Sequence, residues 1–448
     1  MLIWPAIFTL LLKCTTAKIL FEILTQPDEY ELANRLKESL ERDEQNRVEF
    51  SHETGKWGHW TLFQSISRLS KSVSEHSANW LVIVEPYSLV DQQKLCEFLG
   101  NEDSTKAMIF GYALRDEGPT IIHHYHHTPT GPQLPYPDFG AGLAISAALL
   151  KRLADELQQN PYADNFAIDA KHEFAKYLKE RLGIEMEHRP HDFCLFPTDG
   201  CAVSFNAPKY SQEKALDAKD IYAAVKTYSE YHRTRVVAVK RTWGIRLPFI
   251  DYFSDAEDAF VPTKTLGIPN TKRGHCAKTL AILRYYAKNV ESYPNNKWLL
   301  IADDDTLLST PRLLRLLGER DHMKKMIIGE RYGFSYSADG SGGYDYPTGG
   351  SGMIFSKPAA LQLAGNCECP SDDSPDDMII GVCARSFNIP IIHSSSFHQA
   401  RSTDYAKDYI ARQPPISFHK FEDLSPYDEY TKYLHEETGP TSTVHSEL

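Results

Sequence analysis

Three adjacent aspartates, Asp303, Asp304 and Asp305, follow a hydrophobic segment at 297–302. That segment predicts a buried strand, and ligands of open α/β sheets bind at the carboxyl ends of strands. Adjacent carboxylates repel one another unless a cation lies among them, and oxygen ligands suit Mn²⁺ or Mg²⁺. Such a metal could bridge the two phosphates of a nucleotide sugar and neutralise the departing diphosphate. The alternative interpretation is an acidic turn that caps the next helix.

A second acidic pair, Asp376 and Asp377, precedes an apolar helix start at 378–380. A transferase that works by direct displacement needs one base to take the proton of the acceptor hydroxyl, and we predict Asp377 for this role. Asp376 is predicted to cap the helix or to hold the acceptor. The alternative is that both acids are helix caps.

Two further features could contribute to the same site. The turn Gly349-Gly350-Ser351-Gly352 lacks large side chains, so its backbone could approach a sugar closely; the alternative is an ordinary loop into a strand. Downstream, His398 could complete a metal site that begins with carboxylates. Taken alone, a histidine is more often a satisfied core or loop residue.

An internal repeat organises the chain. The matching segments, in the same order in both copies, are 79–100 with 297–318, 135–146 with 345–356, and 164–168 with 376–380. The first pair predicts a buried strand, a turn and a helix in each copy. The aspartates 303–305 correspond to Glu85-Pro86-Tyr87, so the first copy has lost these carboxylates.

The repeat predicts an α/β protein with two tandem Rossmann-like domains. Residues 18–228 would form a non-catalytic copy with a structural or acceptor-binding role, and residues 229–425 the catalytic copy, beginning just before a predicted strand at 236–240. The length of 448 residues suits two domains. The net charge of −12 and the lack of a basic stripe argue against nucleic-acid binding.

The two ends of the chain predict a cellular address. The apolar run at 2–12 is too short to span a bilayer and, with the small residues after it, predicts a signal peptide at 1–17. The alternative is a short buried element of a cytosolic fold. The tail at 426–448 ends in HSEL, which resembles the KDEL/HDEL retrieval signal. Together they predict a soluble protein of the endoplasmic reticulum lumen with no membrane span in the mature chain.

Disulfides are expected in that compartment. Of the eight cysteines, seven follow Cys14, and this odd number leaves one thiol free or paired outside the chain. Cys194 and Cys201 enclose a short loop and are the best local pair. Zinc is the alternative for Cys367 and Cys369, but their spacing is poor for it.

These motifs, in this order, resemble the Fringe-type β1,3-glycosyltransferases. The motifs are VVAVKRTWG (236–244), WLLIADDDT (298–306), YPTGGSGMIFS (346–356), SPDDMIIG (374–381) and SSSFHQAR (394–401). The doubled architecture and the HSEL tail look most like the subgroup that adds glucose to O-linked fucose on thrombospondin type 1 repeats. The resemblance implies tandem GT-A-like domains, UDP-glucose as donor, Mn²⁺ (or Mg²⁺) as cofactor and inversion at the anomeric carbon.

The resemblance also implies residue roles. Asp305 and His398 would ligate the metal, and Asp377 would deprotonate the fucose 3-hydroxyl, with Asp376 near the acceptor. The residues implied for donor binding are Asp303, Asp304, Lys240, Arg241, Trp243, Gly349 and Gly350.

The implied partners are O-fucosylated thrombospondin repeat proteins and a retrieval receptor of the endoplasmic reticulum. The open alternatives are a galactosyl- or N-acetylglucosaminyltransferase of the same fold, a non-catalytic lectin or chaperone, and a nucleotide-sugar hydrolase.

Overall fold

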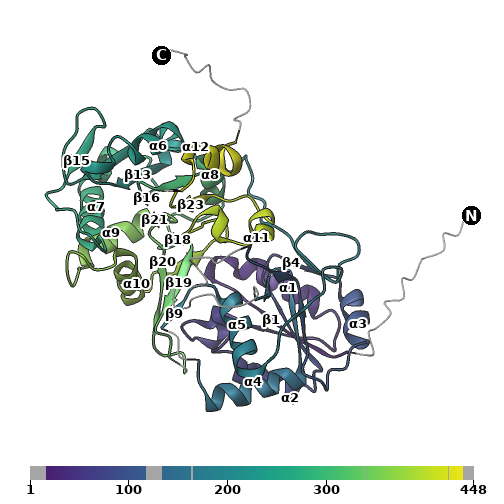
Figure 1. Ribbon diagram of the computed structural model, residues 1–448. Helices are drawn as coiled ribbons and strands as arrows, with labels where there is room; N and C mark the ends of the chain where they lie inside the picture. Colours follow the sequence, from purple (N-terminus) through teal and green to yellow (C-terminus); the bar gives the residue numbers. More distant parts are fainter. Residues whose placement is uncertain (1–16, 118–133, 163–164, 338, 422, 437–448) are drawn as a thin grey trace, which may run out of the picture.

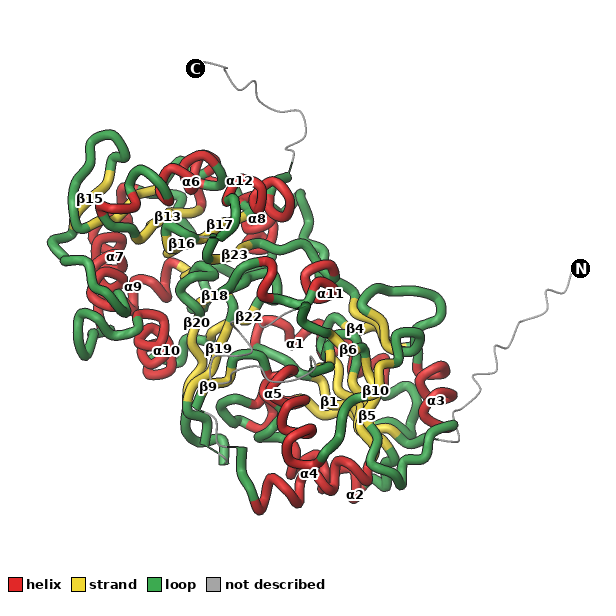
Figure 2. The backbone as a smooth tube through the Cα atoms, in the orientation of Figure 1, coloured by secondary structure: helices red, strands yellow, loops and turns green. Residues whose placement is uncertain are grey.

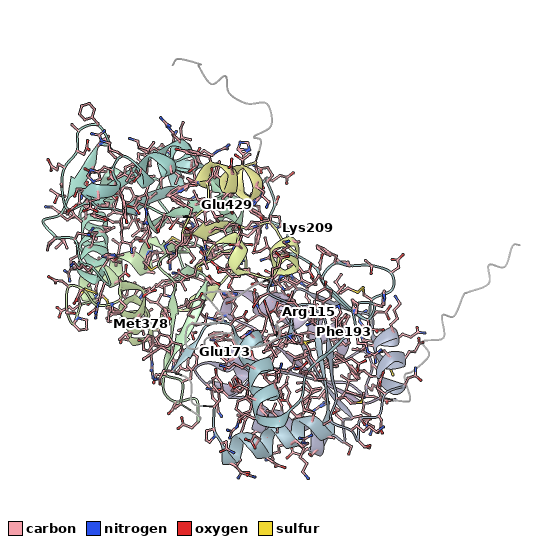
Figure 3. The ribbon with its side chains drawn as sticks, viewed as in Figure 1. Arg115, Glu173, Phe193, Lys209, Met378 and Glu429 are labelled. Atoms are coloured by element: carbon pink, nitrogen blue, oxygen red, sulfur yellow. A yellow bond between two sulfur atoms is a disulfide. The ribbon has the colours of Figure 1, made fainter. Side chains whose placement is uncertain are left out.

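The computed structural model describes residues 17–117, 134–162, 165–337, 339–421 and 423–436. These residues form two α/β halves that lie side by side, each with strands in the middle and helices around them (Figures 1 and 2). Lys209, on the segment that connects the halves, lies at their junction (Figure 3). Among the described residues no helix is both long and apolar enough to cross a membrane. Most of the predicted signal peptide and the HSEL tail lie outside the described residues.

The first half is built on a six-stranded sheet in the order β10-β5-β8-β3-β1-β2. Its strands are β1 (Ile19–Ile23), β2 (Arg47–Phe50), β3 (Trp80–Val84), β5 (Ile109–Gly111), β8 (Leu143–Ser146) and β10 (Glu187–His188). Its helices are α1 (Tyr30–Leu40), α2 (Ile66–Glu75), α3 (Gln92–Gly100), α4 (Ala147–Gln159) and α5 (Ala170–Tyr177).

The second half is built on a seven-stranded sheet in the order β15-β14-β13-β16-β21-β18-β22. Its strands are β13 (Ile221–Lys226), β14 (Ile250–Ser254), β15 (Thr263–Thr265), β16 (Trp298–Asp303), β18 (Ile327–Gly329), β21 (Met353–Ser356) and β22 (Ile391–His393). Its helices are α6 (Arg235–Arg241), α7 (Cys276–Asn289), α8 (Thr310–Gly318), α9 (Lys357–Asn366), α10 (Asp376–Ser386), α11 (Lys407–Ala411) and α12 (Pro426–Glu429).

The two large sheets share strand order and direction. In the first, β1 pairs in parallel with β2 and β3, and in the second, β13 pairs in parallel with β14 and β16. The next strand outward, β8 or β21, runs antiparallel to both of its neighbours. The outermost strand, β10 or β22, is again parallel to the strand it pairs with. The observed architecture is therefore mixed α/β, with β3 and β16 at equivalent positions.

The central strands are apolar throughout because helices cover both faces of each sheet. Successive side chains of a strand point to opposite faces. Accordingly, Trp298 and Leu300 pack into a core with α6 and α8, whereas Leu299 and Ile301 pack into another with α7, α9 and α10. The side chains of β3 divide in the same way between two cores of the first half.

Smaller sheets connect distant parts of the chain. β17 (Thr306–Leu308) pairs antiparallel with β23 (Ser417–His419). β9 (Phe166–Ala167), from the first half, lies beside β19 (Arg331–Phe334), which also pairs with β20 (Tyr344–Pro347) (Figure 1). The other small sheets consist of β4 (Ser88–Val90), β11 (Phe193–Cys194) and β12 (Val203–Phe205), and of β6 (Ala113–Leu114) and β7 (Tyr136–Pro137).

Two details differ from the sequence-based expectation. The second sheet already includes β13, so it begins before the predicted boundary at 228/229. The segment 236–240, predicted as a strand from its β-branched residues, lies in helix α6. In this helix Val236 and Val239 fall on one face and are buried in the core, and this tertiary packing outweighs the local preference.

Three disulfides join described cysteines. Cys194 pairs with Cys201, as the sequence predicts. Cys276 pairs with Cys369 and Cys367 with Cys383, so these two bonds attach the loop before α10 to α7 and to α10 itself. The zinc alternative for Cys367 and Cys369 is therefore wrong. None of the described cysteines is free.

A buried ion pair joins the two halves. Arg412, just after α11, donates from Nη1 to both carboxylate oxygens of Asp138 at 2.7 and 2.6 Å. Both side chains are almost fully buried. A second link comes from Gln26, whose amide exchanges two hydrogen bonds of 2.8 Å with the backbone of His393 on β22.

We predict that Arg412→Met lowers the free energy of unfolding of the full chain by about 3–5 kcal/mol, because it leaves Asp138 buried without its cation. Denaturant unfolding measures the change. The control is Arg35→Met, which removes the exposed pair of Arg35 with Glu31 and should cost less than about 1 kcal/mol. Equal effects of the two substitutions would contradict the structural role given to Arg412.

Candidate functional site

The aspartates lie at the carboxyl edge of the second sheet. Asp303 is the last residue of β16 and faces Lys226, the last residue of its parallel neighbour β13, in the strand register. The Lys226 ammonium lies 2.9 Å from Asp303 Oδ1 and 2.5 Å from Asp376 Oδ2. Burial alone would lower the pKa of Lys226, but these two carboxylates raise it above its usual value. Lys226 therefore stays charged and joins the two acidic motifs.

Asp303, Asp305 and His419 form a group that could hold a metal ion. One ligand atom from each lies within 4.8 Å of the others. His419 reaches the group because β23 pairs with β17, which places it opposite Thr306. Its Nε2 lies 3.0 Å from Asp305 Oδ1, and its Nδ1 lies 2.9 Å from the carbonyl oxygen of Gln399. This carbonyl orients the ring so that Nε2 faces the carboxylates.

The electrostatics of this group fit a cation. Burial opposes protonation of His419, but the charge and hydrogen bond of Asp305 raise its pKa above the usual value. Burial would raise the pKa of Asp305, yet His419 and Arg235 lower it to about 2. Asp305 is thus ionised and His419 holds a proton beside it. A divalent metal could take the place of that proton and bind both side chains. Two carboxylates and one imidazole suit Mn²⁺ or Mg²⁺.

His398, predicted as a metal ligand, lies elsewhere in the core. Its Nδ1 is 2.9 Å from the carbonyl oxygen of Ser417, and its ring stacks on Phe418 at 4.7 Å. Burial lowers the pKa of His398 to about 3. The structure thus brings His419, rather than His398, to the aspartates. The neighbouring β23 strand explains the difference, because its pairing with β17 turns His419 toward Asp305.

The Asp304 carboxylate contacts protein side chains and is not part of the candidate metal group. Its carboxylate accepts a hydrogen bond of 2.6 Å from the Thr227 hydroxyl and lies 3.4 Å from Arg235. Burial raises the pKa of Asp304 to about 7. Arg235, at the start of α6, also lies 2.9 Å from Asp305 and so holds the two neighbouring carboxyl groups together.

The second acidic pair opens helix α10. Asp376 accepts from Lys226 and, at 2.6 Å, from the Thr279 hydroxyl of α7. These contacts outweigh burial and lower the pKa of Asp376 to about 2. Asp377 is less buried. Its carboxylate accepts hydrogen bonds from the backbone amide of Met378 and, at 3.4 Å, from the backbone amide of Gly349.

Burial, followed by repulsion from Asp376, raises the pKa of Asp377 to about 7. A carboxylate with a pKa near the working pH can both take up and release a proton, as general base catalysis requires. Asp376 and Asp377 are adjacent in sequence, yet their surroundings move their pKa values in opposite directions. Such a divergence is typical of functional sites.

The glycine turn lies between the two groups. A side-chain carbon at Gly350 would lie 2.3 Å from His419 Nδ1, so only glycine fits there. The Gly350 carbonyl accepts from the Thr306 hydroxyl at 2.8 Å. Gly349 faces the other way, and a side-chain carbon there would lie 3.9 Å from Asp377. The turn therefore presents bare backbone between the candidate base and the candidate metal group.

The side chains of the segment 240–243, predicted to bind the nucleotide, mainly contact other parts of the protein or solvent. Trp243 is fully buried, and its indole N–H donates to the Thr306 carbonyl at 2.9 Å, so its ring supports the turn after the aspartates instead of facing a donor. Lys240 donates to the Val261 carbonyl at 3.3 Å. Arg241 is exposed on the surface.

Sequence reasoning missed Lys226, Arg235 and His419. Lys226 ends an apolar strand just as Asp303 does, and this pattern could have revealed it. Arg235 and His419 carry no local signal, because each is far from the aspartates in sequence and reaches them only in the folded chain.

We predict that the full chain binds Mn²⁺ and that Asp305→Asn and His419→Ala each weaken this binding at least about tenfold, because each removes a ligand atom. Titration calorimetry, with and without UDP, measures the affinity. His398→Ala is the matched control and should leave the Mn²⁺ affinity unchanged in the folded protein. The reverse pattern, with binding lost on His398→Ala and kept on His419→Ala, would refute the assignment.

Comparisons with known proteins agree with the resemblance. A Fringe-like family model matches residues 216–447. The human Beta-1,3-glucosyltransferase is 39% identical over 427 residues, which are 93% of this chain and 84% of the relative. The mouse Beta-1,3-glucosyltransferase is 38% identical over 428 residues, with 93% and 86% coverage.

A third relative is more distant. The Danio rerio protein named Beta-1,3-N-acetylglucosaminyltransferase lunatic fringe is 27% identical over 256 residues, 50% of this chain and 66% of the relative. With a family model that matches its second half and two relatives that cover nearly its whole length, this chain belongs to the Fringe-like family of glycosyltransferases.

Proposed function

We propose that this protein is a metal-dependent, inverting β1,3-glucosyltransferase. It takes glucose from UDP-glucose and transfers it to O-linked fucose on thrombospondin type 1 repeats. The main structural support is the arrangement around the glycine turn, where Gly349 faces Asp377 and Gly350 faces His419. The proposed donor and linkage are supported by the names of the human and mouse relatives.

In the proposed reaction, Asp377 takes the proton of the fucose 3-hydroxyl while that oxygen attacks the anomeric carbon. The bond from this carbon to the diphosphate breaks in the same step, so no covalent intermediate with the protein forms. Gly349 donates its amide to Asp377 and keeps the carboxylate aimed at the turn. Asp376 holds Lys226 and thereby fixes the start of α10 beside the acceptor.

Asp303, Asp305 and His419 would hold Mn²⁺ or Mg²⁺, and when bound this metal would neutralise charge on the leaving diphosphate. Asp304 would contact the ribose or the nucleotide. Donor roles for Lys240 and Arg241 remain part of the proposal.

We further propose that the chain arose by duplication of one domain and acts in the endoplasmic reticulum lumen. The shared strand order supports two tandem copies of a GT-A-like fold, of which the first has lost its catalytic acids. The three disulfides fit an oxidising compartment, and with the terminal motifs they support the endoplasmic reticulum lumen. Retrieval would then depend on a receptor that reads HSEL.

We predict that Asp377→Asn lowers glucose transfer to an O-fucosylated thrombospondin repeat by about 10²–10⁴-fold, because the amide cannot take the proton. Transfer is measured as product formed from UDP-glucose with Mn²⁺. In the wild type, the rate should fall as the pH drops through about 7, where Asp377 gains a proton, and should level off above it.

The control is Asp373→Asn, which changes an exposed acid of the preceding loop and should leave transfer unchanged. UDP-galactose and UDP-N-acetylglucosamine test the alternative donors, and a higher rate with either would replace glucose in the proposal. Full activity of Asp377→Asn would rule out its role as the base. No transfer from any donor would favour the lectin or chaperone alternative.

A further inference from the structure

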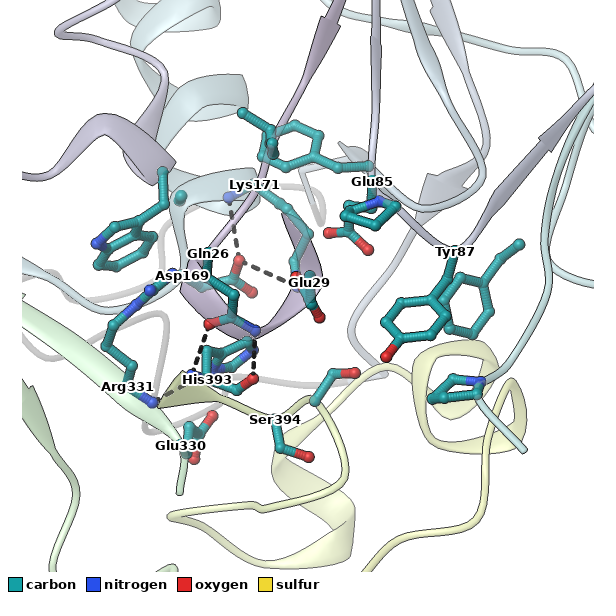
Figure 4. Close-up of a pocket in the computed structure, with 18 of the residues that line it drawn as sticks. Gln26, Glu29, Glu85, Tyr87, Asp169, Lys171, Glu330, Arg331, His393 and Ser394 are labelled. Carbon is teal, nitrogen blue, oxygen red and sulfur yellow. Dashed lines mark hydrogen bonds and ion pairs between the residues drawn. The ribbon is translucent and has the colours of Figure 1, made fainter. Parts of the chain in front are cut away.

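A cavity of about 150 Å³ lies between the two halves. This is about ten times the space that one buried water needs, so the cavity has room for a small ligand. Residues from both halves line it, and Figure 4 shows their polar groups turned toward a common space. Glu85 and Tyr87 come from the first half, and Glu330 and His393 from the second.

The cavity has the same place in the first half as the candidate site has in the second. Glu85 directly follows β3, as Asp303 ends the equivalent strand β16. Asp169 caps the start of α5, as Asp376 begins α10. Glu85 and Asp169 both line the cavity. The carboxyl edge of a sheet is where α/β folds bind ligands, so this position favours a binding site.

Most cations of the cavity are paired with acids, which argues against an anionic ligand such as a phosphate. Four described cationic residues line it, and each lies beside an acid or an aromatic ring. The pairs are Lys171 with Asp169 at 3.6 Å, Arg412 with Asp138 at 2.6 Å, Arg320 with Asp28 at 2.9 Å, and Arg331 over the Trp60 ring at 4.7 Å. An acid therefore neutralises three of these four cations, whereas Arg331 lies over a ring without an ion pair among the described residues.

Glu85 is the acid of the cavity with acceptor capacity to spare. No described residue donates a hydrogen bond to the Glu85 carboxylate, and Figure 4 shows it at the edge of the open space. Burial raises the pKa of Glu29 and of Glu330 to about 8, so both keep a proton near neutral pH and can donate as well as accept. Groups of this kind match hydroxyls, which also donate and accept.

Aromatic rings provide the remaining surface. Tyr87, Phe139 and Phe205 of the first half, with Tyr332 and Tyr409 of the second, line the same cavity. Aromatic walls with a few polar groups that fix orientation are the usual construction of small-molecule sites. A sugar ring combines apolar C–H faces with a rim of hydroxyls and therefore fits both features.

We propose that this cavity is a second saccharide site, which binds one neutral pyranose ring with Glu85 as a hydrogen-bond acceptor. The ring could be a free sugar or part of a glycan. The site is distinct from the candidate transfer site, and its binding does not depend on the transfer proposed above.

The test is binding of methyl α-L-fucoside and methyl β-D-glucoside to the full chain. Saturation-transfer NMR is recorded in EDTA and without nucleotide, so that the metal group contributes nothing and no transfer occurs. We expect saturable binding of at least one glycoside, weakened at least tenfold by Glu85→Ala and less by Glu85→Gln, which keeps an acceptor oxygen. An O-fucosylated repeat that competes with the glycoside identifies the glycan as the source, and a lack of competition identifies the free sugar.

The matched control is Glu38→Ala, which removes an exposed acid of α1 and should not change binding. Thermal unfolding of each variant shows that it is folded. The proposal is overturned if neither glycoside binds, if folded Glu85→Ala and Glu85→Gln both bind as the wild type does, or if inorganic phosphate displaces the glycoside.

Discussion

The ion pairs of Lys226 are the interaction on which the candidate site depends. Five aspartates gather at one edge of the second sheet, and without a counter-charge their repulsion would open it. Lys226 is buried between Asp303 and Asp376 and so fixes helix α10 against the end of β16. A buried cation is costly unless it is paired, so the two carboxylates and the lysine stabilise one another only in this arrangement. The candidate base and the candidate metal group owe their positions to it.

The two halves meet at the carboxyl edges of their large sheets. The cavity between the halves is therefore close to the candidate metal group. Glu330 lines the cavity between the halves and accepts the backbone amide of Gln399. The carbonyl of Gln399 accepts from His419, which contacts Asp305. A continuous chain of hydrogen bonds therefore runs from the cavity to the candidate metal group. This chain of hydrogen bonds lies within the second half, and the first half borders its far end at the cavity.

Motifs with local signals were predictable, and contacts between distant segments were not. The strand before Asp303, the acidic start of α10 and the Cys194–Cys201 disulfide followed from hydrophobic runs and short spacings. The approach of His419 to the aspartates could not be predicted, because the pairing of β17 with β23 that brings it there has no local signature. Helix α6 was missed for a similar reason: its valines were read by their strand preference, while core packing decides their conformation.

The proposed reaction is a single displacement with the acceptor and the diphosphate on opposite faces of the sugar. The configuration of the product tests this most directly. NMR of the disaccharide formed from UDP-α-glucose and a fucosylated acceptor reports the coupling between the first two ring protons of the transferred glucose. We expect the β configuration, the result of one inversion with Asp377 as the base. An α-linked product would contradict it, because retention requires a different mechanism and a different role for the acids at this edge.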